Sequence, residues 1–174
     1  SNNPGTSNRT VTYTVTDASG GTSNDARVIS VTAANDAPTI SIDASTLAYT
    51  ENDAATQIDA AAISSDADGD ADWNTGTLVV QMTGNNEAAD ELSILDNVVG
   101  TINTDGTNLQ DGATVIGTLS SSEGTVTDGT ALTITLNSNA TNALVQELVR
   151  AIHYRNTSNN PGTSNRTVTY TVTD

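Results

Sequence analysis

Several residue types are missing from this chain, and each absence narrows its chemistry. Its 174 residues include no cysteine, no phenylalanine and a single histidine. Without cysteine there are no disulfides, zinc–thiolate sites or cysteine nucleophiles. Since there is only one histidine, a metal cage built from several histidines is excluded as well. No apolar run approaches the ~20 residues that a membrane-spanning helix needs, so insertion into a membrane is not expected.

Positive charge is also scarce. Five basic residues face 21 acidic ones, which gives a formal net charge of −16, and there is no lysine among them. The five are Arg9, Arg27, Arg150, Arg155 and Arg166. A field of this sign repels phosphate backbones and anionic lipid, so nucleic-acid and membrane-surface partners are disfavoured. Cations are the expected partners.

The chain begins and ends with the same sequence, which defines the length of a repeat. Residues 1–17 read SNNPGTSNRTVTYTVTD, and residues 158–174 read the same seventeen letters at an offset of 157 residues. This period is far longer than the 20–50 residues of solenoid repeats. We therefore expect each repeat to be an autonomous domain within a tandem array.

The boundary between two such domains is expected to lie within the chain. Residues 9–17 alternate threonine with valine and tyrosine, which is typical of a half-buried strand. Turn residues follow, and residues 26–32 alternate again, so a hairpin is predicted. Pro38 fixes an extended linker. We expect residues 1–34 to be the terminal hairpin of the preceding repeat, 35–38 the linker, and 39–174 a repeat that lacks its last strand.

Beyond Pro38 most of the chain is predicted to be strand. The candidates are Thr39–Ile42, Leu47–Thr50, Thr77–Gln81, Glu91–Leu95, Val98–Ile102, Thr114–Leu119, Ala131–Leu136 and Ala151–Asn156. Polar turns separate them, with hairpin turns expected at Asp105-Gly106 and Asp111-Gly112. Leu144, Leu148 and Ile152 recur at helical spacing instead. The pattern predicts an all-β, immunoglobulin-like sandwich with one short helix near residues 140–150.

One acidic run carries the clearest chemical signal. Asp66, Asp68, Asp70 and Asp72 occupy alternate positions, and their carboxylates would repel one another. Calcium takes six to eight oxygen ligands, so the run predicts a calcium-binding loop. The alternative is a solvated acidic turn. An EF-hand is excluded, because the glutamate that closes such a loop would fall on Thr77.

Further motifs occur in a fixed order along the chain. They are Asn35-Asp36-Ala37-Pro38, Tyr49-Thr50-Glu51-Asn52, Ser65-Asp66-Ala67-Asp68, Arg150-Ala151-Ile152-His153-Tyr154-Arg155-Asn156-Thr157 and Thr169-Tyr170-Thr171-Val172-Thr173-Asp174. Together they resemble the cadherin-like tandem (extender) repeats of giant bacterial RTX-type surface adhesins. The resemblance spans essentially the whole chain and implies a cadherin-like Greek-key β-sandwich. The chain departs from cadherins in lacking an Asp-Arg-Glu motif and in its extra middle region, residues 85–137.

The resemblance implies calcium ions at the junctions between repeats. The ligands expected where the linker enters the domain are Asp36, Asp66, Asp68 and Asp174. Glu51 would face the opposite junction. Asp17 occupies the repeat position of Asp174 and would serve the preceding junction. Asp70 and Asp72 are further candidates, each about as easily solvated as bound.

The implied function is mechanical: a calcium-stiffened extender repeat that projects a distal binding domain from the bacterial surface in cell adhesion or biofilm formation. Its partners would be neighbouring repeats and calcium, and its location extracellular. The alternative is a glycan- or protein-binding module that uses Trp73, itself either a core anchor or a sugar-stacking platform, or the middle region. Catalysis is not expected, since His153 lies within a predicted strand and is expected at the surface or partly packed. Residues 1–34 are expected to pair within the chain or to exchange a strand with another chain, because an isolated hairpin is marginal in water.

Overall fold

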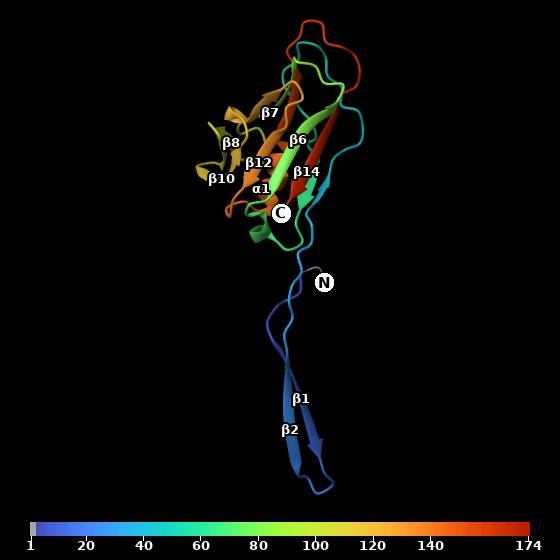
Figure 1. Ribbon diagram of the computed structural model, residues 1–174, viewed down its shortest axis with the longest axis vertical. Coiled ribbons are helices and arrows are strands. Elements are labelled where there is room, and N and C mark those ends of the chain that lie inside the picture. Colours follow the sequence, from blue (N-terminus) through green and yellow to red (C-terminus); the bar gives the residue numbers. More distant parts are fainter. Residues whose placement is uncertain (1–2) are drawn as a thin grey trace. The chain divides into compact units, whose positions relative to one another are not determined.

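The computed structural model describes residues 3–174 and divides the chain into two compact units (Figure 1). The first unit is Ser1–Asp36 and the second is Ala37–Asp174. Antiparallel strands dominate both. The structure confirms the predicted all-β sandwich with one helix.

The first unit is a hairpin of two strands. β1 (Arg9–Thr16) pairs with β2 (Thr22–Ile29), and Tyr13 lies opposite Asp25. The turn is tighter than predicted because the Asp17 carboxylate accepts the backbone N–H groups of Ser19 (2.9 Å) and Gly21 (2.8 Å). β2 therefore begins before the predicted start at residue 26.

Two larger sheets form the second unit. The first sheet has the order β14-β6-β12-β10-β9-β8, the second β11-β7-β13-β4, and β3 and β5 form a separate pair. In the first sheet the strands are β14 (Thr167–Thr173), β6 (Thr77–Gly84), β12 (Leu132–Leu136), β10 (Thr114–Leu119), β9 (Asn108–Asp111) and β8 (Ile102–Asp105). In the second they are β11 (Thr125–Thr127), β7 (Asp90–Ile94), β13 (Ile152–Asn156) and β4 (Thr56–Gln57), and the separate pair is β3 (Thr39–Ser41) and β5 (Ile63–Ser65).

Period-two burial places the core between the sheets. In β6, Leu78, Val80 and Met82 are buried, whereas the residues between them, Val79 and Gln81, are half-buried. β12 follows the same alternation. β7 is buried along its whole length, as expected of a strand covered on both faces. Apolar side chains that alternate in the sequence therefore meet in one continuous core.

The helix α1 (Asn142–Arg150) confirms the prediction near residues 140–150. It begins at Asn142 because the Thr141 side chain, in extended backbone, accepts the N–H of Leu144 (3.2 Å) as an N-cap. Its Val145, Leu148 and Val149 are buried. Two short 3₁₀ turns complete the unit: η1 (Asp70–Trp73) and η2 (Ser122–Gly124).

Two predicted strands are wrong. Leu47–Thr50 forms no ladder; the segment is held instead by the Tyr49 hydroxyl, which donates to backbone oxygens of Asp53 (2.9 Å) and Asn156 (3.3 Å). Val98–Ile102 is mostly turn, since Asn97 (φ 56°) and Gly100 (φ 56°) adopt left-handed backbone. Only its last residue belongs to a strand, β8. His153 is also more deeply packed than expected: it is 3% exposed, and its Nδ1 contacts the Ala151 carbonyl (2.7 Å).

The repeated sequence occupies two different environments. In β14, Val168, Tyr170 and Val172 pack against the core. Their counterparts in β1 include Tyr13, which is 65% exposed, and Val15, which is 69% exposed. The same sequence therefore forms a strand packed on the core in one unit and an exposed hairpin strand in the other.

This contrast predicts unequal costs for one substitution made at equivalent positions. Tyr170→Ala removes a ring packed on the core and should lower the free energy of unfolding by about 3 kcal/mol. Tyr13→Ala should change it by less than about 0.5 kcal/mol. Denaturant titrations followed by the fluorescence of Trp73, the one tryptophan of the chain, measure both. Equal effects at the two positions would contradict the assignment of β14 to the core.

Candidate metal centre

Three carboxylates converge between β5 and the end of η1. Asp66, Asp68 and Asp72 each offer one oxygen, and these oxygens lie within 4.8 Å of one another. Like charges at such separations repel strongly, especially where burial lowers the effective dielectric. The arrangement is therefore favourable only with protons or a cation among the carboxylates.

Asp66 is the buried member of this group, at 5% exposure. Its Oδ1 accepts the N–H of Asp68 (2.7 Å), which folds the loop back on itself. Its Oδ2 is buried and has no hydrogen-bond partner. An unpaired buried carboxylate oxygen is costly unless something binds it. The residues present thus fit a hard cation, for which this oxygen is an available ligand.

Asp174 belongs to the same neighbourhood. Burial raises the pKa of Asp72, and the negative charges of Asp68, Asp66 and Asp174 raise it further. A divalent cation would act in the opposite direction on each of these carboxyl groups. The last residue of the repeated sequence is therefore electrostatically coupled to the acidic loop.

Asn142, at the start of α1, holds this loop in place. Its Oδ1 accepts the N–H of Asp66 (2.6 Å) and the indole N–H of Trp73 (3.1 Å), and its Nδ2 donates to the Asp66 carbonyl (3.1 Å). Its backbone N–H donates to Asp70 (2.7 Å). Sequence reasoning missed Asn142, because nothing local marks a partner 76 residues away.

Asp72, rather than Asp70, completes the cluster. Asp70 is exposed and its carboxylate caps the first N–H of α1. Trp73 is fully buried, at 0% exposure. Trp73 is therefore the core anchor, and its burial rules out the sugar-stacking platform.

The other predicted ligands lie elsewhere. Glu51 is exposed in a turn and accepts from Asn52 (3.3 Å); the same turn is tied by Tyr49 to Asn156. In the first unit, Asp36 is half-buried at the boundary, and Asp17 closes the hairpin turn. The described cluster of three thus joins Asp66 and Asp68 with Asp72 of the predicted acidic loop, and it does not include Asp17, Asp36, Glu51, Asp70 or Asp174.

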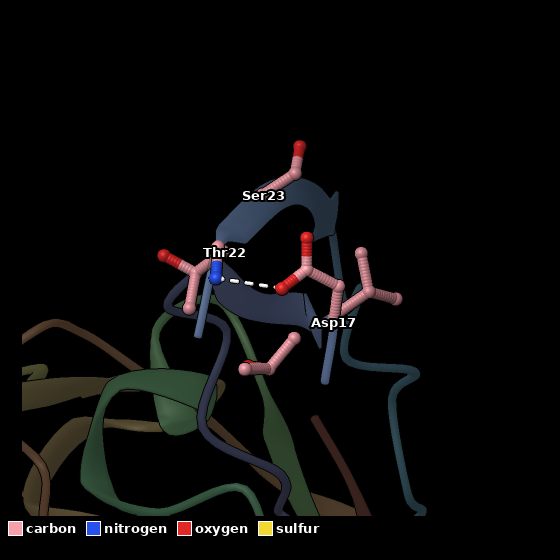
Figure 2. Close-up of a pocket in the computed structure, with 6 residues that line it drawn as sticks. Asp17, Thr22 and Ser23 are labelled. Atoms are coloured by element: carbon pink, nitrogen blue, oxygen red, sulfur yellow. Dashed lines mark hydrogen bonds between the residues drawn. The ribbon is translucent and has the colours of Figure 1, made fainter. Parts of the chain in front are cut away.

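An open hollow lies at the tip of the hairpin. Asp17, Thr22 and Ser23 line it together with Val15 and Gly21 (Figure 2). One Asp17 oxygen already accepts two backbone N–H groups. The hollow is therefore a consequence of the turn geometry, in which the Asp17 carboxylate has a structural role.

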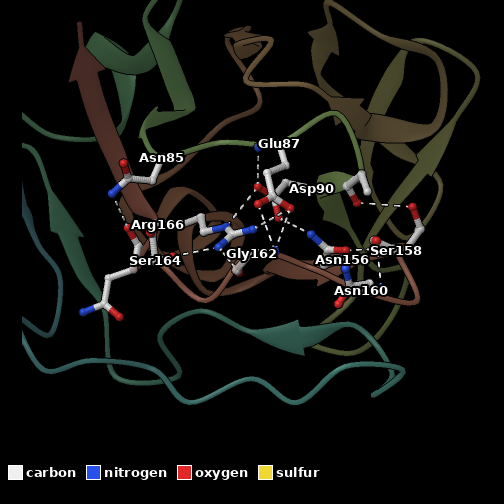
Figure 3. A network of polar contacts seen from close by, with 12 residues as sticks. Asn85, Glu87, Asp90, Asn156, Ser158, Asn160, Gly162, Ser164 and Arg166 are labelled. Atoms are coloured by element: carbon white, nitrogen blue, oxygen red, sulfur yellow. Dashed lines mark hydrogen bonds and ion pairs between the residues drawn. The ribbon is translucent and has the colours of Figure 1, made fainter.

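A second polar cluster lies at the other end of β14 from Asp174 (Figure 3). Asp90 is fully buried and accepts from the Tyr154 hydroxyl (2.7 Å), Asn156 Nδ2 (2.7 Å) and Arg166 Nε (3.1 Å). Arg166 also pairs with Glu87 (3.0 Å) and donates to two carbonyls of the loop before β14. Here Arg166 supplies positive charge to both carboxylates, and the cluster fixes the loop to the sheet.

Comparison with known proteins adds no relative: no protein-family model, curated protein or solved structure matches this chain. Within residues 3–174, no helix has the length and apolar character needed to cross a membrane.

Asn142→Ala tests how the loop is held. The substitution leaves the N–H groups of Asp66 and Trp73 unpaired in a buried place, so it should lower the free energy of unfolding by about 2–3 kcal/mol. Asn159→Ala, at an exposed position, is the matched control and should cost less than about 0.5 kcal/mol. Denaturant titration in the presence of chelator measures both, and equal costs would exclude the supporting role of Asn142.

The environment of Asp90 predicts how the stability of the fold depends on acidic pH. Burial alone would raise the pKa of Asp90, but hydrogen bonds from Tyr154, the Glu87 N–H, Asn156 and Arg166 outweigh burial and hold it below the ordinary value. Because the folded pKa is depressed, ionised Asp90 stabilises the fold above the unfolded pKa of ~3.9, and this contribution is lost as pH falls through the folded pKa.

The free energy of unfolding of the wild-type chain should therefore fall as pH drops from about 5 towards 2, by up to ~1.4 kcal/mol per pH unit from this one group. Asp90→Asn should be less stable at pH 7, since Arg166 loses its buried partner, and should show a shallower pH dependence. Urea titrations across this range compare the two slopes. Identical slopes would contradict the depressed pKa.

Proposed function

We propose that this chain is a calcium-stabilised structural repeat of a large bacterial surface adhesin, with a mechanical role and no catalytic one. The observation that carries the proposal is the cluster of Asp66, Asp68 and Asp72, in which a buried carboxylate oxygen of Asp66 has no partner. The strand that precedes Asp174 is the sequence that recurs at both ends of the chain.

The donor set favours calcium over softer metals. The three candidate ligands are all carboxylates, the chain has no cysteine, and its one histidine is buried against its own backbone. Carboxylate oxygens suit hard cations, and an all-oxygen set in a loop matches calcium in particular. Calcium would supply charge balance that five arginines cannot give to 21 acids.

The position of the cluster supports a mechanical role. Asp66 follows β5, whose partner β3 is the first strand after the linker, and Asp174 follows β14, which pairs with β6 in the main sheet. An ion held by Asp66, Asp68 and Asp72 near Asp174 would connect the entry of the chain to the main sheet. Pulling on either segment would then work against ion–oxygen contacts as well as strand pairing.

The adhesin assignment rests on the tandem repeat and on the ordered motifs shared with extender repeats of bacterial surface adhesins. An extracellular location would supply calcium at the concentration such a site needs. Because the chain has no cysteine, a bound ion would provide the cross-link that a disulfide provides in other extracellular proteins. A glycan-binding role loses its main support, because the ring of Trp73 is buried.

Thermal unfolding with and without calcium tests the proposal. Calcium binds the folded site alone, so 100-fold excess over its dissociation constant adds about 2.7 kcal/mol, and the melting midpoint should rise by roughly 5–10 °C over that in chelator. Asp66→Asn should remove most of this rise. Asp105→Asn, which removes an equal charge at an exposed hairpin turn, should retain it. An unchanged wild-type midpoint would refute the proposal.

A further inference from the structure

Two strands of identical sequence have different neighbours. Residues 9–17 and 166–174 are the same, yet β1 pairs with β2 while β14 pairs with β6. β14 is the last strand of its sheet, and no other described strand pairs with it; β3 approaches it without forming a ladder. One edge of β14 thus presents unpaired backbone groups, which is where an added strand can bind.

The edge of β1 that holds β2 can be identified from the turn. The N–H of Asp17 donates to Gly21 (2.9 Å), and the Asp17 carbonyl accepts from Gly20 (3.1 Å). In an antiparallel ladder every second residue directs its backbone groups to the same side. Tyr13 and Val15 therefore direct theirs to β2.

The edge of β14 that holds β6 follows by the same rule. Leu136 of β12 donates to the Gly76 carbonyl (2.8 Å), so alternate residues from Gly76 face β12 and those from Thr77 face β14. Thr77 lies opposite Thr173, so Thr173 and its alternate neighbours face β6. Tyr170 and Val172 consequently direct their backbone groups to the open edge.

Tyr170 and Val172 are the repeat counterparts of Tyr13 and Val15. The open edge of β14 is therefore the same edge, in sequence and in backbone direction, as the edge of β1 that holds β2. We propose that the open edge of β14 binds β2 from a second copy of this chain, in the register that places Asp25 opposite Tyr170.

Exchange would keep the same strand pairing and move β2 from an isolated hairpin to the edge of a larger sheet. Ile29 lies opposite Arg9, on the face of the hairpin that carries Tyr13, and it is 46% exposed. On β14 the corresponding face is the one that packs on the core through Val168 and Tyr170. The same cross-strand pairs would form, and Ile29 would approach that core together with Asp25 and Arg27, which share its face. The pairing given up is that of a two-stranded hairpin, which is marginal by itself.

This register is easier to reach when β2 comes from a second copy than when it comes from the same chain, because residues 30–38 limit how far β2 can move. Ile29 would lie opposite Arg166, at the start of β14, whereas Thr39 pairs with Ser65, beside Asp66, at the Asp174 end. Residues 30–38 would have to return along about 24 Å of β14, close to the full reach of ~30 Å for nine residues. A second copy carries no such constraint, and reciprocal exchange between two copies would give a closed dimer.

The absence of native cysteine makes the register testable by disulfide trapping. In the hairpin, Asn24 lies opposite Thr14 and Ala26 opposite Thr12, so on β14 they would lie opposite Thr171 and Thr169. All four positions are exposed. These are pairs that do not exchange backbone hydrogen bonds, about 4.5 Å apart at Cα, which a disulfide can bridge.

Each position is changed to cysteine in a separate full-length protein, and the proteins are mixed in pairs under mild oxidation. We expect N24C with T171C, and A26C with T169C, to form mixed disulfide dimers at least ~10-fold faster than the shifted pairs N24C with T169C and A26C with T171C. Equal rates for matched and shifted pairs would overturn the proposal. All variants are checked for folding by the fluorescence of buried Trp73.

A single chain that carries both N24C and T171C separates the two possible donors of β2. Cross-linked dimer supports exchange between copies, whereas cross-linked monomer alone shows that a chain covers its own edge and overturns it. Asp25→Pro, which removes a ladder N–H, should abolish the dimer in sedimentation experiments while leaving the second unit folded. Because none of these readouts involves a metal, the result stands apart from the calcium melting experiment.

Discussion

Repulsion between the carboxylates of Asp66, Asp68 and Asp72 is the constraint on which the account of this protein depends. The loop brings three acids together and leaves one buried oxygen of Asp66 without a partner. Burial raises the pKa of Asp72, and the charges of Asp68, Asp66 and Asp174 raise it further. A sequence selected only for a stable apo fold would gain by replacing one of these acids. In the function proposed above, a cation among these carboxylates, beside Asp174, would offset this repulsion.

Acidic residues lie near both ends of β14, but their charge partners differ. At its start, Asp90 and Glu87 both pair with Arg166, and nearby Glu91 pairs with Arg155 (2.8 Å). At its end, the buried Oδ2 of Asp66 has no hydrogen-bond partner. Arginines thus supply positive charge at the start of the strand, and we propose that a bound cation would supply it at the end. Under that proposal, the stability of the end near Asp174 would follow the calcium concentration, whereas the start of the strand would be stable without calcium.

Much of the fold was predictable from sequence, because period-two alternation and turn residues are local signals. Most predicted strands, both Asp-Gly turns and the helix are present. Leu47–Thr50 and Val98–Ile102 failed because their apolar residues lie in irregular segments, the second within a left-handed turn. The site was predicted in part. The alternating acids suggested a ligand loop, but the 3₁₀ turn after Gly69 (φ 102°) directs Asp70 to the helix and Asp72 to the cluster. Neither that turn nor the long-range role of Asn142 has a sequence signature.

The central claim is that Asp66, Asp68 and Asp72 hold calcium in the folded chain. A crystal structure determined from protein grown in calcium tests it most directly, since the ion and its ligands are then observed together. The account predicts one calcium ion bound by oxygens of all three residues, Oδ2 of Asp66 among them, at about 2.3–2.6 Å. A well-ordered loop with no ion among the three carboxylates, or with Asp66 Oδ2 bonded to a protein group, would contradict it.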